Sequence, residues 1–161
     1  MTMIIDGSAG VTFPNSTVQA SAGQVLQVVN ATYSTQTSTT TNSFIDTGLS
    51  ATITPKFATS KILVLITHNG NLTNNTGANG LQFKIYRGAT DLGIFENAAP
   101  YGNATSGQFL GGAVAMSYQD SPATASATTY KTQFCSRENV STVFVQYASS
   151  KSTITLMEIA A

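Results

Sequence analysis

The stretch Ile62-Leu63-Val64-Leu65-Ile66 is an unbroken run of five apolar residues, and it decides the fold class that the sequence predicts. Lys61 precedes the run and the turn-prone His68-Asn69-Gly70-Asn71 follows it, so the segment has the length of a strand rather than a helix. Because all five side chains are apolar, we expect a central strand that is buried on both faces. An aspartate at Leu63 or Leu65 is then expected to abolish folding.

The segments on either side of this run alternate apolar and polar residues. Residues 81–87 present Leu81, Phe83 and Ile85 on one face, and residues 49–54 alternate in the same way. A period of two places the apolar side chains on one face of a strand and leaves the other face toward solvent. The chain also holds 10 Val, 10 Ile and 25 Thr residues, whose β-branched side chains favour sheets. The sequence therefore predicts an all-β protein.

Candidate strands lie near residues 25–33, 44–54, 61–68, 81–87, 92–96, 109–118, 129–135, 142–148 and 153–159. The intervals are too short for crossover helices, so we expect antiparallel pairing, with hairpins joining 81–87 to 92–96 and 142–148 to 153–159. Many short strands with Gly, Ser and Asn turns indicate a β-sandwich. Their number fits a jelly roll better than an immunoglobulin sandwich, which usually carries a core Trp that this chain lacks. The expected architecture is an antiparallel β-sandwich with a jelly-roll-like head.

The chain divides into two parts by composition. Residues 1–24 alternate short apolar pairs with Gly, Ser and Pro, and they offer too few apolar groups to fold alone. We expect an N-terminal attachment or oligomerisation segment over residues 1–24 and a globular β-sandwich domain over residues 25–161. The Thr-rich stretch from Ser34 to Ser43 is expected to be an exposed loop.

Charge is scarce, and this excludes several classes of partner. Lys and Arg number 7, Asp and Glu number 7, and charged residues make up 9% of the chain. Nucleic-acid binding needs many cationic contacts with phosphates, so we expect no nucleic-acid partner. An anionic membrane surface is disfavoured for the same reason, and no apolar run approaches the length of a membrane span, so membrane insertion is not expected.

Catalytic and metal-binding patterns are weak. Cys135 is the one cysteine and is expected to be a half-buried strand residue, and His68 is the one histidine and is expected to end a strand. A Gly-x-Ser-x-Gly elbow, a phosphate loop and a dinucleotide fingerprint are all absent from the sequence. We therefore expect no enzymatic activity, no cofactor, no catalytic residue and no metal site.

Several segments carry a resemblance to a known group of proteins. Gly10-Val11-Thr12-Phe13-Pro14-Asn15-Ser16-Thr17-Val18-Gln19 resembles an element of tailed-phage tail fibres and related virion structural proteins, especially those of marine phages and cyanophages. Asn15-Ser16 stands where that element usually has Asp-Gly, which loosens the expected turn. Residues 25–29, 44–55, 60–64 and 154–159 resemble the C-terminal globular modules of the same proteins.

The resemblance implies a virion protein, a homotrimer with a β-rich head and an N-terminal segment that docks on other virion proteins. The docking residues expected from it are Val11, Phe13, Pro14 and Val18. Residues 111–118 are rich in Gly, Ala and Val and form a candidate subunit interface, although the same pattern fits a buried strand of a monomer.

Host attachment would place a receptor site on long polar loops. The loops at residues 69–80 and 97–108 combine amides with a tyrosine, groups that bind sugar hydroxyls and apolar sugar faces. We therefore expect a host surface polysaccharide to contact Asn74, Asn75, Tyr101 and Asn103. The alternative is that both loops are only solvated turns.

Three functions stay open at this point. The first is a trimeric tail-fibre or fibre-tip protein that takes part in host attachment. The second is a capsid decoration, head-fibre or cement protein, which would use the same head and docking segment. The third, a glycan-degrading tail enzyme, is disfavoured by the short chain and by its dispersed carboxylates.

Overall fold

A computed structural model of the chain describes residues 4–6, 10–12, 18–19, 23–74, 77–104 and 106–161. Three short strands come first: β1 (Ile4–Asp6), β2 (Gly10–Thr12) and β3 (Val18–Gln19). The strands that follow are β4 (Val25–Tyr33), β5 (Thr37–Thr39), β6 (Ile45–Ile53), β7 (Lys61–Asn74), β8 (Gly77–Arg87), β9 (Thr90–Glu96), β10 (Tyr101–Ala104), β11 (Gln108–Asp120), β12 (Thr128–Ser136), β13 (Val143–Val145) and β14 (Ser152–Ile159). The 3-10 helix η1 spans Tyr147–Ser149, and the described residues include no helix long and apolar enough to cross a membrane.

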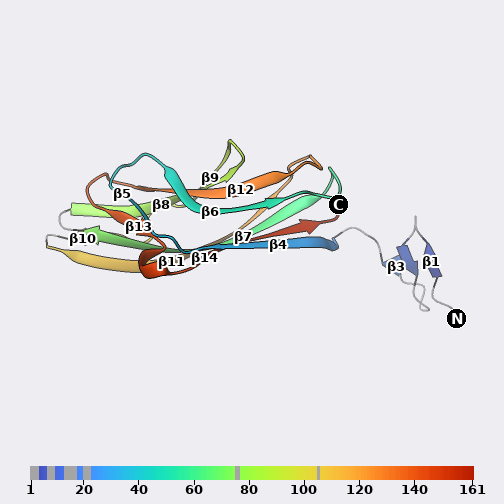
Figure 1. Ribbon diagram of the computed structural model, residues 1–161, viewed down its shortest axis with the longest axis horizontal. Coiled ribbons are helices and arrows are strands. Elements are labelled where there is room, and N and C mark those ends of the chain that lie inside the picture. The colour runs from blue at the N-terminus through green and yellow to red at the C-terminus, as the bar shows by residue number, and fades with distance from the viewer. Residues whose placement is uncertain (1–3, 7–9, 13–17, 20–22, 75–76, 105) are drawn as a thin grey trace.

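Two antiparallel sheets pack face to face as a sandwich (Figure 1). In sheet one, β7 pairs with β11 along one edge and with β14 and then β13 along the other, and β4 and β5 complete the sheet outside them. In sheet two, β8 pairs with β12 on one side and with β9 and β10 on the other, and β6 lies outside β12.

The connectivity is that of a jelly roll. β9 and β10 occupy one strand position along the same edge of β8, and β13 and β14 occupy one along the same edge of β7. β4 and β5 likewise occupy one position, because they pair with β14 and β13. Counting these positions in chain order, sheet one has the order 1-8-3-6 and sheet two has the order 2-7-4-5. Two interleaved Greek keys of this kind define the jelly roll. The predicted fold class is confirmed.

The core lies between the sheets, where the predicted alternation of side chains holds. Leu49 and Ile53 of β6 are each 1% exposed, and Leu81, Phe83 and Ile85 of β8 are buried on the same inner face of sheet two. Each such side chain contributes about 1.5–3 kcal/mol when it leaves water.

The central run is not buried on both faces in the single chain. Ile62, Val64 and Ile66 are buried in the core, whereas Leu63 and Leu65 are half-buried and point outward from sheet one. The expectation was wrong because β7 lies in one layer of a two-layer sandwich, so only alternate side chains face the other sheet.

Three further expectations differ from the structure. Residues 142–148 and 153–159 do not form a hairpin, because β13 and β14 follow one another along the same edge of β7. The Thr-rich stretch 34–43 contains β5, which pairs with β13. The strand expected at 61–68 continues to Asn74, so much of the expected loop 69–80 is strand.

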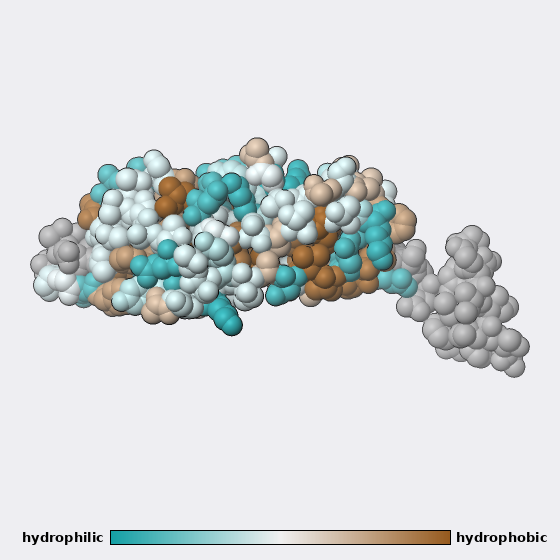
Figure 2. Space-filling view, in the orientation of Figure 1, coloured by the Kyte–Doolittle hydropathy of each residue, from teal (hydrophilic) through white to brown (hydrophobic). Residues whose placement is uncertain are grey.

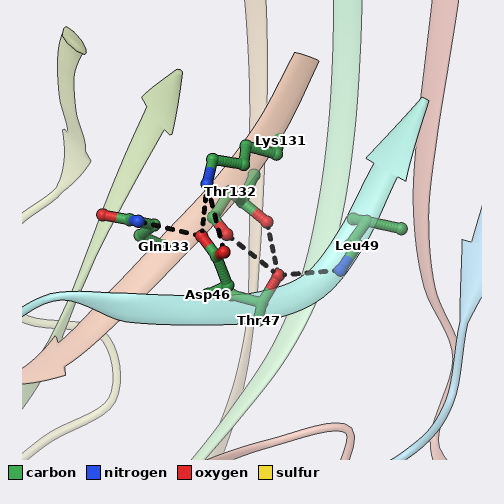
Figure 3. A network of polar contacts seen from close by, with 6 residues as sticks. All are labelled: Asp46, Thr47, Leu49, Lys131, Thr132 and Gln133. Carbon is green, nitrogen blue, oxygen red and sulfur yellow. Dashed lines mark hydrogen bonds and ion pairs between the residues drawn. The ribbon is translucent and has the colours of Figure 1, made fainter. Parts of the chain in front are cut away.

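Strand β6 contains a bulge where it pairs with β12. Ser50 pairs with Lys131 and Asp46 with Gln133, so three residues of β6 face Thr132 alone. Within the bulge Gly48 has φ +86°, and the hydroxyl of Thr47 lies 2.7 Å from that of Thr132 and accepts the backbone N–H of Leu49 at 3.1 Å (Figure 3). These side-chain hydrogen bonds take the place of the backbone hydrogen bonds that the bulge interrupts.

The N-terminal strands form a separate small sheet. β2 pairs with β1 and β3, and in Figure 1 this sheet lies beyond the end of the sandwich that carries the C-terminus. Val11 and Val18 belong to β2 and β3, whereas Phe13 and Pro14, also expected to dock on the virion, lie outside the described residues.

Candidate functional site

The outer faces of the two sheets differ in charge. The outer face of sheet two carries ion pairs of Lys131 with Asp46 at 2.9 Å and of Lys84 with Asp91 at 2.8 Å. On the described strands of sheet one, the alternation of buried and exposed residues leaves Lys61 as the one charged side chain on the outer face. Sheet one therefore presents a surface with a single charge, Lys61, which lies opposite Ile159 at the start of β7.

One end of this surface is apolar. Val28, Met157 and Leu63 lie side by side on β4, β14 and β7 by register, and Val28 is 55% exposed. Leu65 follows on β7, and Ile159 on β14. We call these five residues the apolar patch. Hydrophobic side chains also gather near the C-terminal end on the face drawn in Figure 2.

The other end of the same surface forms a groove of about 410 Å³. Its lining residues are Asn69 and Asn71 of β7, Gly111 and Gly112 of β11, Tyr147 of η1, and Ser150. A Cβ atom at Gly111 would lie 2.6 Å from Nδ2 of Asn71, so the missing side chain leaves room for the Asn71 amide. On β7 the nearest residues of the patch and the groove, Leu65 and Asn69, are four residues apart, which places the groove about 13 Å from the apolar patch.

The segment between β13 and β14 holds Tyr147 at the groove. Gln146, Ala148 and Ser149 have φ values of 53°, 51° and 63°, a left-handed conformation that costs non-glycine residues about 1–2 kcal/mol each. The buried Gln146 amide donates to Ser152 Oγ at 3.0 Å and anchors the segment. The resulting turn directs Tyr147 outward, where its ring lies 4.9 Å from that of Phe109 and 5.8 Å from that of Phe144, between centroids.

The groove contains an unused hydrogen-bonding group. Ser150 Oγ is buried and has no hydrogen-bond partner among the described residues. Buried hydroxyls without a partner are rare, and they often mark a site where water or a ligand completes the bonding. Amides, a hydroxyl and an aromatic face without a charged group can bind a neutral polar molecule by hydrogen bonds and stacking.

The predicted receptor residues lie elsewhere. Tyr101 and Asn103 are exposed on β10, and the ladder with β8 ends beside the β7–β8 turn. Asn74 is the last residue of β7, and Asn75 lies outside the described residues. Sequence reasoning missed the groove because Asn69 and Asn71 were assigned to a loop. The signal that could have revealed it is Gly111-Gly112 inside an expected strand, which marks a close approach of other groups.

A serine and a histidine also meet, in the core. His68 lies within β7 rather than at its end, with Nδ1 2.9 Å from Ser152 Oγ and Nε2 2.8 Å from Thr132 Oγ1. Both His68 and Ser152 are fully buried, and burial lowers the pKa of His68 to about 3. The imidazole is therefore neutral, no carboxylate orients it, and a substrate cannot reach the serine. Its hydrogen bonds instead join β7 and β14 of sheet one to β12 of sheet two.

Cys135 is fully buried on β12 rather than half-buried, and burial raises the pKa of its thiol to about 11. The thiol is therefore protonated at neutral pH and unreactive. The described residues contain no group of three His, Cys, Asp or Glu side chains that could hold a metal ion.

No protein-family model matches the chain, and no curated protein matches it. Solved structures of infectious bursal disease virus are similar to it. The Gx strain structure aligns with a TM-score of 0.42 and 16% identity over 85% of this chain and 37% of that chain. The T13 viral particle aligns with a TM-score of 0.42 and 13% identity over 95% of this chain and 42% of that chain. The chain thus spans less than half the length of these viral chains.

Proposed function

We propose that this chain is a homotrimeric structural protein of a phage virion, a tail-fibre or fibre-tip protein that takes part in host attachment. The observation that carries the proposal is the outer face of sheet one, which has Lys61 as its one charged side chain on the described strands and an apolar patch at the end nearest the N-terminal segment. The tail-fibre resemblance of residues 10–19 supports the virion assignment.

A second copy of this chain is the partner that best fits the apolar patch. Identical faces with a single charge at one end repel one another little and lose little hydration when they are buried. The run Ile62–Ile66 carries five apolar side chains, and the single chain buries only three of them. Contact with another subunit would cover Leu63 and Leu65 as well, which accounts for an apolar run on a strand of a two-layer fold.

The same end of the head offers a hollow for docking. It measures about 240 Å³ and is lined by Leu26, Phe57, Thr59, Ala160 and Ala161. Phe57 is 56% exposed there. Exposed apolar residues at the end that continues into residues 1–24 suit contact with other virion proteins.

Light scattering coupled to size exclusion tests the proposal. The full chain is expected to have a trimer mass, and Leu63→Glu, which places a charge in the apolar patch, is expected to shift it toward the monomer. Ser50→Glu, on the outer face of sheet two, is the matched control and is expected to remain a trimer. Both variants should keep their melting temperature, because both side chains point away from the core. A monomeric parent chain would refute the trimer.

Imaging of virions labelled on this protein tests its position. Label at the tail tip supports the attachment role. Label distributed over the capsid would replace it with the decoration or cement role, since that role uses the same oligomeric head.

A further inference from the structure

We propose that the groove between β7, β11 and η1 binds a neutral oligosaccharide, and that it is the receptor site in place of the exposed loop residues. The inference rests on the proposed function for the origin of the ligand, which would be a host surface polysaccharide. The binding itself depends only on the groove.

The chemistry of the lining selects this class of ligand. Asn69 and Asn71 supply amides, which both donate and accept hydrogen bonds, as sugar hydroxyls do. Ser150 Oγ adds a hydroxyl that has no partner among the described residues. Tyr147 is 40% exposed and Phe109 is 50% exposed, so their rings can cover the apolar C–H face of a sugar.

The absence of charge in the lining disfavours acidic glycans and phosphorylated ligands. The six lining residues include no Lys or Arg to pair with an anion. A peptide fits less well, since extended peptides add to sheet edges by backbone pairing, and this groove lies on a sheet face. An open groove on a face suits a chain of sugar rings.

Two structural features support a binding site in the groove. The three left-handed residues around Tyr147 carry strain that places the ring over the groove, and such strain is typical of functional sites. Gly111 leaves the space that the Asn71 amide occupies, since a Cβ there would lie 2.6 Å from Nδ2.

Calorimetric titration of the full-length chain with dextran, mannan and galactan fragments, and with heparin fragments as the anionic comparison, tests the proposal. We expect at least one neutral glycan to bind and heparin not to bind. Tyr147→Ala should weaken binding about tenfold through loss of stacking. Gly111→Val should abolish it, whereas Ala115→Val, four residues along the same face and paired with Thr67 outside the groove, should leave it unchanged.

The double variant Tyr101→Ala with Asn103→Ala separates the two candidate sites. We expect it to bind as the parent chain does. Loss of binding in this double variant but not in Gly111→Val would overturn the groove, as would failure of every neutral glycan to bind or equal binding of heparin. The oligomer mass is measured on the same samples. An intact trimer that binds no neutral glycan refutes the groove alone, whereas a monomer that binds refutes the trimeric assembly alone.

Discussion

His68 makes the stability of the protein depend on pH. Burial lowers the pKa of its imidazole from 6.5 to about 3. Between these values the unfolded chain binds a proton that the folded chain does not bind, so stability is full above about pH 6.5 and is lost as the pH falls toward 3. The slope reaches about 1.4 kcal/mol per pH unit for one group. Urea unfolding at pH 7, 6 and 5 should show this loss.

His68→Gln isolates the contribution of the imidazole. Glutamine keeps hydrogen-bonding groups near Ser152 and Thr132 but does not titrate. Glu158 has a lowered pKa because hydrogen bonds from Gln27 and two backbone N–H groups outweigh the effect of burial, and it therefore affects stability only at lower pH. The free energy of unfolding of the variant should be nearly constant between pH 6 and 5. A slope equal to that of the parent chain would assign the effect to other groups.

The bulge in β6 depends on one glycine. Gly48 has φ +86°, and a Cβ atom there would lie 2.2 Å from Cε1 of Tyr33 on β4. Gly48→Ala therefore adds both backbone strain and a clash with a ring, and it should lower the free energy of unfolding by about 3 kcal/mol. Denaturant unfolding measures the change.

Gly88→Ala is the matched control for this prediction. Gly88 also has a positive φ, +56°, but a Cβ atom there would meet nothing within 4 Å. Only backbone strain remains, so the expected loss is about 1 kcal/mol. Equal losses in the two variants would show that the Tyr33 ring moves aside and that the clash contributes nothing.

Periodicity predicted most strands of the jelly roll because alternation is a local property. β4 spans the predicted residues 25–33, and β8 and β9 form the predicted hairpin. The course of β13 and β14 along a single edge could not be predicted, since it depends on the left-handed turn at Gln146, where no glycine signals it. The groove escaped prediction for a related reason. Phe109 and Tyr147 are distant in the chain and meet only after β11 and η1 have packed beside β7.

At the scale of the whole molecule the two ends of the head have different properties. The apolar patch lies at the end that continues into residues 1–24, and the groove begins about 13 Å away along β7, at Asn69. Under the proposed function, this separation would leave the groove accessible while the other end contacts neighbouring subunits and other virion proteins. We also expect folding and subunit association to depend on the head and not on the N-terminal segment.

A chain of residues 23–161 tests that prediction. The cut leaves intact the backbone bonds from Gly23 N to Ala160 O and from Ala160 N to Gln24 O, both 2.8 Å, which tie the start of β4 to the end of the chain. Because the core residues that the structure describes all follow this point, the shortened chain should keep the melting temperature of the full chain. Since the apolar patch is retained, light scattering should also give the same oligomer mass. A folded monomer would instead assign association to the N-terminal segment, and an unfolded product would show that this segment belongs to the domain.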